Sequence, residues 1–354
     1  MRTLAEGSDS LTRVGLIEPR GHTREIIAGA IAIMGTLGVG SLIFLSQGVD
    51  PLSAYFRMLQ GIFGSPSDIR SYLTEITPLL VIGLGLAISF KARLWNIGAE
   101  GQFVGGALVG GVVAINLADA PGYLGIPLSL VAGVAGGAAA GWLVGILKAR
   151  WDVNEVITSL LLNFIIAFAY NYSIRQPFQD PATYVPESAP VPEHLELPEF
   201  PSIEVHIGFV IGLILIPLVW HVLANTRFGF RVRMIGENRS AAHALGVRDR
   251  RMIVQILSLS GALAGLAGAI QILGVQHRLV EGISPGYGFT AIIVAVIGSL
   301  TPVGVLIGAS LVAALTVGGE ALQRFEEIPA AIIDVLNALL IVFAIVARRF
   351  VRNE

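Results

Sequence analysis

Long apolar stretches alternate with short polar connections along most of this chain. Each stretch is close to the roughly 20 residues that an α-helix needs to cross the hydrocarbon core of a bilayer. We therefore expect an all-α fold, a polytopic transmembrane helix bundle of about ten spans, with nine to eleven as the range left open. The predicted spans lie at residues 26–46, 71–90, 99–116, 123–147, 154–174, 206–224, 252–274, 288–300, 303–317 and 329–347.

Two regions depart from this simple pattern. The eighth and ninth stretches are short and contain Ser299, Thr301, Pro302 and Gly304, which predicts a broken or partly re-entrant segment. The amphipathic segment Pro51–Phe63 predicts a helix at the membrane interface. A long polar stretch of about 25 residues precedes the first apolar one, so we interpret that first stretch as a retained span and not as a signal peptide.

Lysine and arginine are divided unequally between alternate connections. If the N-terminus is inside, 18 of the 23 basic residues fall on the inner side. Because basic residues are retained on the cytoplasmic side during insertion, this bias predicts a cell inner (plasma) membrane protein with both termini in the cytoplasm. It also predicts a cytoplasmic tail at residues 1–25, a transmembrane domain at 26–350, an outer loop at 176–205 and an inner loop at 225–251.

Composition narrows the function classes. The chain is 54% hydrophobic and only 14% charged, and it has no cysteine, which excludes disulfides and thiolate metal sites. Its only lysines, Lys91 and Lys148, are each followed by alanine, so neither belongs to a phosphate-binding loop. The histidines show no zinc-site spacing. We therefore expect no catalytic residue, no metal, no cofactor bound by this chain and no nucleic-acid partner.

Glycine spacing predicts how the helices pack. Glycine recurs every four residues from Gly133 to Gly145, which lays a smooth strip along one face of the fourth span. Such strips allow a second helix to approach closely. The same spacing occurs in three further pairs: Gly106 with Gly110, Gly261 with Gly265, and Gly304 with Gly308.

The outer loop has a distinctive composition. Residues 176–205 contain seven prolines and six acidic residues and no lysine or arginine. This composition predicts a largely extended, proline-stiffened segment. It is either a solvated connector or a surface that receives a partner, and the sequence leaves both open.

Polar residues at three places in the apolar background are candidates for a translocation path. The first follows Lys91 and includes Asn96, Glu100 and Gln102; helix capping and a path role are both consistent with it. The second is Asn154-Glu155 with Asn163, for which capping and interhelical hydrogen bonds are the structural alternatives.

The third place is the turn-rich segment 284–290, which opens the eighth span. A plain loop would explain it, but transporters also place broken helices of this kind near their substrate.

The inner loop differs in composition from these three candidate path segments, because it combines seven arginines with a patch of small residues. A positive-inside loop explains the arginines. The alanines predict a short helix that ends at Gly246 and fits a groove of another protein.

The runs Leu94–Gln102, Asn154–Thr158 with Asn163, and Pro285–Phe289 closely resemble permeases of bacterial nucleoside ABC importers, within the branched-chain amino acid and ribose permease superfamily. The resemblance covers about residues 25–350. It implies an inverted-repeat fold and an inner loop that docks on an ATPase, although Ser240 stands where the coupling motif has glutamate. The implied coupling residues are Gly236, Glu237, Asn238, Ala241, Ala242 and Gly246.

The resemblance also implies a set of partners: two ATPase subunits that bind ATP and magnesium, a second and commonly non-identical permease, and a periplasmic or lipoprotein solute-binding protein. We expect this chain to form a nucleoside path lined by the second, third, fifth and eighth spans. Aromatic stacking and hydrogen bonding to a nucleoside suggest the path residues Phe90, Trp95, Asn96, Glu100, Gln102, Asn163, Tyr287 and Phe289.

Other functions stay open at this point. The same class of importer carries simple sugars or branched-chain amino acids. An ion-coupled secondary transporter would need a buried titratable relay, for which the chain offers few carboxylates. A membrane scaffold without a solute path is a further alternative.

Overall fold

The computed structural model describes residues 21–201, 203–326 and 329–352. These residues are mostly helical and include no strand, which confirms the all-α prediction. Residues 1–20 of the predicted cytoplasmic tail lie outside the described residues. The chain divides into two compact units, one made of Met1–Pro51 with Ala331–Glu354 and the other of Leu52–Ala330.

The smaller unit consists of α1 (Gly21–Ser46) and α13 (Ala330–Arg352), which correspond to the first and last predicted spans. A Cβ atom added at Gly35 of α1 would lie 2.8 Å from the ring of Phe343 in α13. The two helices therefore pack directly against each other at a glycine.

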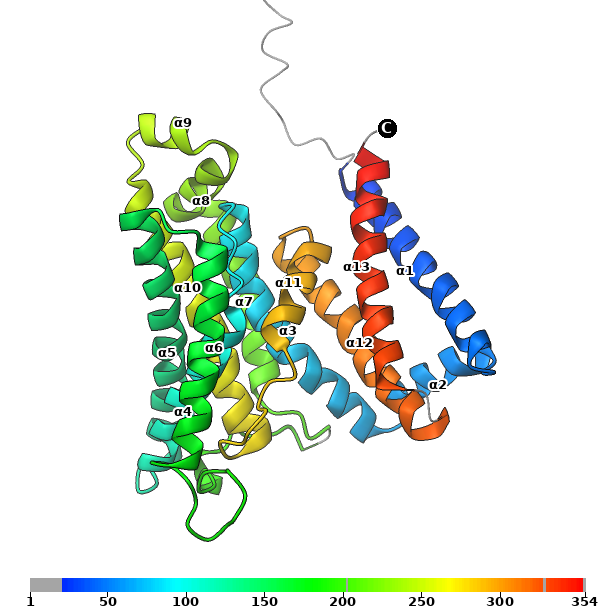
Figure 1. The fold of residues 1–354 in the computed structure, drawn as a ribbon, viewed down its shortest axis with the longest axis horizontal. Coiled ribbons are helices and arrows are strands. Elements are labelled where there is room, and N and C mark those ends of the chain that lie inside the picture. The colour runs from blue at the N-terminus through cyan, green and yellow to red at the C-terminus, as the bar shows by residue number, and fades with distance from the viewer. Residues whose placement is uncertain (1–20, 202, 327–328, 353–354) are drawn as a thin grey trace, which may run out of the picture. The chain divides into compact units, whose positions relative to one another are not determined.

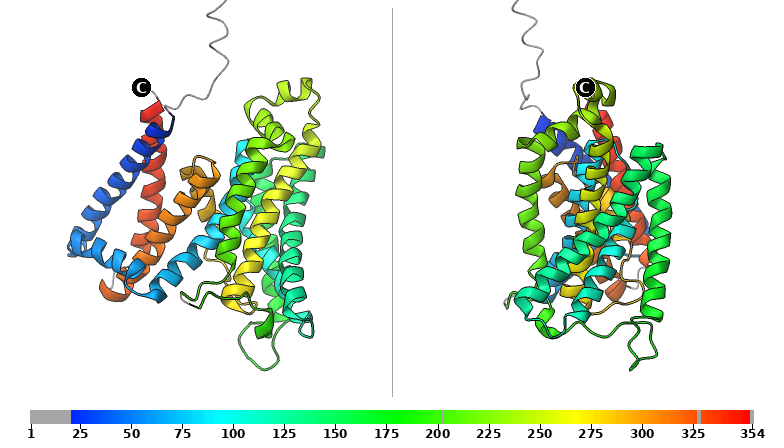
Figure 2. Two further views of the ribbon diagram at one scale, coloured as in Figure 1. Left: turned by 180° about the vertical axis from the view of Figure 1, so that it is seen from behind. Right: turned by 90° about the vertical axis from the view of Figure 1, so that its left-hand side faces the viewer.

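The larger unit holds the other helices (Figures 1 and 2). They are α2 (Pro51–Phe63), α3 (Pro66–Lys91), α4 (Ala99–Asn116), α5 (Gly122–Trp151), α6 (Glu155–Arg175), α7 (Gly208–Asn225), α8 (Arg227–Glu237), α9 (Arg239–Ala244), α10 (Asp249–Gln271), α11 (Tyr287–Ile297) and α12 (Pro302–Glu326). A 3₁₀ turn at Glu193–Leu195 and a π-helical turn at Ile272–Gln276 complete it.

The predicted count of ten spans is not confirmed. Within the described residues, six helices are long and apolar enough to cross a membrane, namely α3, α5, α6, α7, α10 with its π-helical turn, and α12. The number rises to seven if Ile31–Ser46 and Pro51–Phe63 count as one broken span. The predicted eighth span is the clearest difference, because α11 has only 11 residues and a rise of about 1.5 Å per residue makes it half a span.

Local sequence explains where several helices begin. Ser65 caps α3 by accepting a hydrogen bond from the backbone N–H of Asp68 at 3.2 Å, and Pro66 occupies the first helical position. Asn154 caps α6, which was one of the roles left open by the sequence, and accepts a hydrogen bond from the N–H of Val156 at 2.9 Å. Such caps satisfy donors that the first turn of a helix leaves free.

The glycine strips hold the bundle together as predicted. Gly133 and Gly137 of α5 pack directly on the backbone of Gly265 in α10, and Gly106 of α4 reaches the same glycine from another side. Gly308 of α12 likewise packs on the backbone of Val294 in α11. These contacts leave no room for a side chain, so α10 lies in close backbone contact with α4 and α5.

The outer and inner loops lie at opposite ends of the larger unit, as the alternation of the connections predicts (Figures 1 and 2). The outer loop is more than a solvated connector. Leu195 and Leu197 are buried, and Glu187 forms an ion pair with Arg278 at 2.6 Å. Proline stiffening removes helices from most of the segment, but its leucines still pack onto the bundle.

His206 lies in this packed region, immediately before α7, and is 2% exposed. Neither ring nitrogen has a hydrogen-bond partner within the described residues. Burial, with smaller contributions from His277 and Arg70, lowers the pKa of His206 to about 4. The imidazole is therefore neutral in the folded protein at neutral pH.

This burial predicts a pH dependence of stability. The unfolded chain protonates His206 near pH 6.5 and the folded chain near 4, so stability is fully present above about 6.5 and declines as pH falls toward 4. The loss should approach about 3 kcal/mol. Thermal unfolding in detergent between pH 7.5 and 4.5 measures it, and His206→Leu should flatten the profile. An unchanged profile in that variant would contradict the assignment.

Candidate functional site

A non-helical segment with buried and exposed residues in alternation connects α3 to α4 at residues 92–98. Leu94 is 5% exposed and Asn96 is fully buried. Backbone groups that enter a membrane bundle without helical bonds need other partners, and α6 supplies two. Ser159 accepts a hydrogen bond from the N–H of Ile97 at 3.2 Å, and the Asn163 amide donates to the carbonyl of Ile97 at 2.9 Å.

Asn96 is the centre of a closed polar network. Its amide donates to Gln102 at 2.8 Å and to the hydroxyl of Ser260 at 3.0 Å, and its oxygen accepts from Gln102 at 3.1 Å and from the N–H of Gly98 at 3.1 Å. Gln102 is 1% exposed. In this conformation both side chains hold the segment in place and do not line an open path. Asn96 turns the backbone into α4, but the capping position belongs to Gly98.

The start of α4 meets the start of α11. The carboxylate of Glu100 accepts a hydrogen bond from the backbone N–H of Gly288 at 2.7 Å, and Gly288 packs against the backbone of Glu100 so closely that no side chain fits. Asn163 braces the same turn from α6 by accepting from the N–H of Gly101 at 2.8 Å. Two helix N-termini, each with a partial positive charge, are thus brought together beside a carboxylate.

This meeting corrects an expectation from the span pattern. That pattern placed the segment around Glu100 on the inner side of the membrane and Pro285–Phe289 on the outer side. The structure brings the two into contact, because the chain re-enters the bundle before α4 and α11 is only half a span. Two broken helices whose N-termini converge are typical of transporter binding sites.

Tyr287 links this junction to α3. Its hydroxyl donates to the carboxylate of Glu75 at 2.9 Å, and its ring packs edge-on against Phe103 with centroids 5.7 Å apart. Glu75 is not among the path residues that the sequence predicts. The signal that would have found it is a carboxylate within an apolar stretch, where an ionisable side chain is costly.

The predicted path residues fall into three groups. The first group belongs to the junction of α4 and α11. Glu100 and Tyr287 lie at the junction itself, and three buried side chains support it: Asn96, Gln102 and Asn163. Phe90 and Trp95 pair with each other with centroids 4.8 Å apart, and no described contact joins them to that junction. Phe289 is 43% exposed on α11. The helices predicted to line the path, α3, α4, α6 and α11, do converge here.

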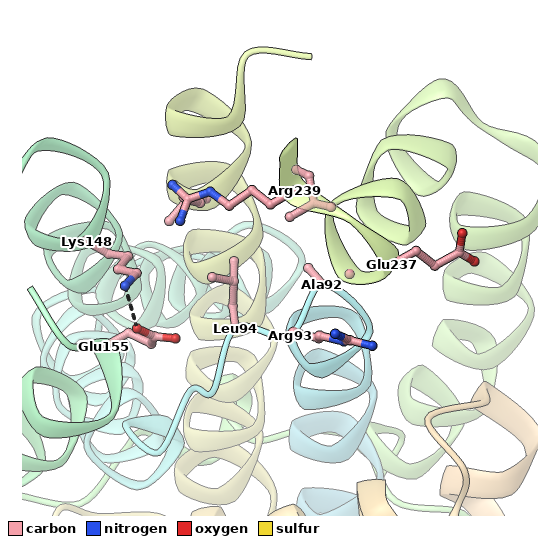
Figure 3. A pocket seen from close by; sticks show the side chains of 10 residues that line it. Ala92, Arg93, Leu94, Lys148, Glu155, Glu237 and Arg239 are labelled. Atoms are coloured by element: carbon pink, nitrogen blue, oxygen red, sulfur yellow. Dashed lines mark ion pairs between the residues drawn. The ribbon is translucent and has the colours of Figure 1, made fainter. Parts of the chain in front are cut away.

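A separate pocket lies at the end of the larger unit that carries the inner loop, which we call the inner end (Figure 3). Its volume is about 260 Å³, and its lining comes from the α3–α4 connection, the end of α5, the start of α6, and α8 to α10. Lys148 points toward Glu155, at 3.2 Å, and also pairs with Asp152 at 2.9 Å. The hydrogen bond and the charge of Lys148 lower the pKa of the exposed Asp152 carboxyl.

The predicted coupling residues lie at the same end of the larger unit, on the last turn of α8, on α9 and in the turn after it. Asn238 caps α9 by accepting from the N–H of Ala241 at 3.0 Å, Ala242 is fully buried, and Gly246 ends the helix with a φ of +80°. Gly236 packs on the carbonyl of Lys91, whereas Glu237 is exposed. The predicted short helix with a glycine stop is therefore present, and Leu245, 73% exposed, lies just past its end.

Comparison with known proteins identifies the family. The sequence model of the branched-chain amino acid transport system permease component matches residues 69–345. The chain belongs to this permease family. No solved structure matches the permease at a significant level.

Several characterised relatives are similar over nearly the whole permease. A glucose ABC transporter permease of Haloferax volcanii is 34% identical over 91% of this chain and 87% of its own length. A guanosine ABC transporter permease of Bacillus subtilis is 34% identical over 90% and 92%. A nucleoside ABC transporter permease of Lactococcus lactis is 29% identical over 91% of both chains. The family match and the six long apolar helices together identify the permease as a multi-pass membrane protein.

Proposed function

We propose that this permease forms the translocation path for nucleosides in an ATP-driven importer. The observation that carries the proposal is the junction of α4 and α11, where Glu100 holds Gly288 and Tyr287 bonds to Glu75. A nucleoside offers hydroxyl and amino donors for carboxylates and a planar base for aromatic rings. The relatives named for guanosine and nucleosides support this choice of solute.

The proposal includes separate ATPase subunits and an outer solute-binding protein. The exposed end of α9, with the small residues around it, is suited to a groove on an ATPase subunit. The ATPase subunits, and not this chain, bind ATP and magnesium. ATP binding then moves the inner loops, which rock the bundle between outward and inward openings. The packed outer loop, at the other end of the larger unit, is where the binding protein would deliver the solute.

We also propose a second, non-identical permease as the dimer partner. Bacillus subtilis has two proteins named guanosine ABC transporter permease, and this chain is 34% identical to one and 25% identical to the other. Lactococcus lactis shows the same division, with identities of 29% and 24%. This division supports a heterodimeric path. We place it in an inner membrane with both termini of this chain in the cytoplasm, a proposal that rests on the distribution of lysine and arginine.

One alternative solute has specific support. The 34% identity to a glucose permease favours simple sugars as a second candidate. Both solute classes carry adjacent hydroxyl groups, which suit carboxylate acceptors such as Glu75 and Glu100. Nothing on the described residues favours a branched-chain amino acid.

Uptake by cells that express the permease with its partners distinguishes these solutes. We expect labelled guanosine or another nucleoside to be taken up and competed by unlabelled nucleosides, with little competition by glucose or ribose. Uptake should persist under an uncoupler and fail when ATP is depleted. Competition by glucose alone would reverse the choice of solute, and uptake that collapses with the uncoupler while ATP is maintained would indicate an ion-coupled transporter.

A further inference from the structure

A second pocket at the inner end is lined largely by arginine. It has a volume of about 470 Å³ and lies between α8 and the start of α10. Its lining residues are Arg231, Gly246, Arg248, Arg251, Met252 and Gln255. It shares none of them with the pocket around Lys148 and Glu155. The two pockets at this end are therefore chemically distinct.

The charge of this pocket is not neutralised by the chain itself. In the described ranges, Arg231, Arg248 and Arg251 form no ion pair with a carboxylate. The nearest candidate, Asp249, is already bonded to Arg239 at 3.1 Å and 3.2 Å. Three exposed guanidinium groups thus surround a hollow that contains no described acidic side chain.

The arginines of the inner loop are not spread evenly. Arg227 and Arg250 belong to the same loop but do not line the pocket, and Arg233 bonds to the backbone carbonyl of Leu223. A positive-inside bias explains why arginine is abundant on this side. It does not explain why three of them gather around one hollow at the N-terminus of α10, where the partial positive charge of the helix adds to theirs.

The pocket lies where a membrane span begins. Arg251 is in the first turn of α10, and the apolar span follows directly. Figure 1 shows α9, the element proposed to contact the ATPase, beyond this end of α10. The pocket is therefore at the base of the inner loop. In a bilayer crossed by this apolar span, we expect the lipid headgroups to lie at the same level. Arginine recognises phosphate oxygens through paired N–H donors, and anionic lipids attract basic segments at this depth.

We propose that Arg231, Arg248 and Arg251 bind the phosphate of an anionic phospholipid headgroup in the inner leaflet. The bound headgroup connects α8 to α10 at the base of the inner loop. The ligand is recognised by its phosphate and its negative charge, whichever solute the permease carries.

Native mass spectrometry and thermal unfolding of the purified full chain test this site. Phosphatidylglycerol added to the detergent-solubilised protein should stay bound and raise the unfolding temperature, whereas phosphatidylcholine should do neither. Arg248→Gln with Arg251→Gln should reduce phosphatidylglycerol retention about tenfold. The matched control, Arg227→Gln with Arg250→Gln, removes two charges from the same loop and should retain it as the wild type does.

Lysine substitutions separate folding from recognition. Arg248→Lys with Arg251→Lys keeps the charge but loses the paired donors, so retention of phosphatidylglycerol should fall to an intermediate level while the protein remains folded by size-exclusion chromatography.

Equal retention in the glutamine variants and the control, or equal binding of the two lipids, would overturn the proposal. If inorganic phosphate at the same concentration raised the unfolding temperature equally, the phosphate bound by the arginines would not need to come from a lipid, and the lipid proposal would be wrong. Glutamine variants that keep the lipid but lose the ATPase would assign the arginines to a protein contact instead.

Discussion

Replacing Glu100 with alanine should lower solute uptake about tenfold or more while the protein still accumulates in the membrane. The carboxylate accepts a hydrogen bond from the N–H of Gly288 at 2.7 Å, and hydrogen bonds to a charged group contribute about 1.5–3 kcal/mol. Without it, the N-terminus of α11 is no longer fixed against α4. Uptake by whole cells, normalised to the amount of protein in the membrane, measures the effect.

Two variants control this prediction. Glu100→Gln keeps an oxygen that accepts from Gly288, so it should retain more uptake than the alanine variant. Asp119→Ala removes an exposed carboxylate from the α4–α5 connection, outside the outer loop, and should leave uptake within about twofold. Normal uptake in Glu100→Ala would contradict a path role, and so would loss of the protein from the membrane, because that result would make Glu100 a folding residue.

Gly106→Ala should destabilise the permease by about 3 kcal/mol or more. A Cβ atom at this position would clash with the backbone of Gly265 in α10, where no side chain can rotate away. The helices would have to separate where α4 and α5 both contact the backbone of α10 at Gly265. Thermal unfolding in detergent and the yield of folded protein measure the loss.

The neighbouring residue provides a matched control. A Cβ atom at Gly105 would lie 3.5 Å from the side chain of Ile166, which is an ordinary contact distance. Gly105→Ala should therefore be neutral or slightly stabilising, since alanine favours a helix over glycine. Equal effects of the two substitutions would show that helix propensity, and not the close backbone contact, accounts for both glycines.

The glycine contacts illustrate what sequence patterns predict well. Spacing of four residues places Gly133, Gly137 and Gly141 on one helix face whatever the rest of the fold does. That face has only a few ways to be buried, and close packing against another helix is the one that suits glycine. The structure confirms the packing and adds the partner, α10, which the spacing could not identify.

Caps and stops were predictable for the same reason. Asn154 at the start of α6 and Gly246 after α9 act on their own turn of the chain, so neighbouring residues suffice to recognise them. Ser159 and Ser260 show the opposite case. A serine in an apolar helix usually bonds to its own backbone, as the Ser159 hydroxyl does by donating to the carbonyl of Val156 at 3.3 Å. Nothing in the sequence indicates that Ser159 and Ser260 also bond to the α3–α4 connection.

The sequence by itself determined the all-α membrane fold, the separation of the two loop faces and the permease family, because apolar length, basic residues and motifs act along the chain. Only the tertiary structure decided that α4 and α11 meet at their N-termini and that Glu75 joins Glu100 there through Tyr287. A hydropathy pattern assigns each stretch to one full crossing. A chain that re-enters the bundle is stabilised instead by hydrogen bonds from residues more than 60 positions away, such as that between Asn163 and Ile97.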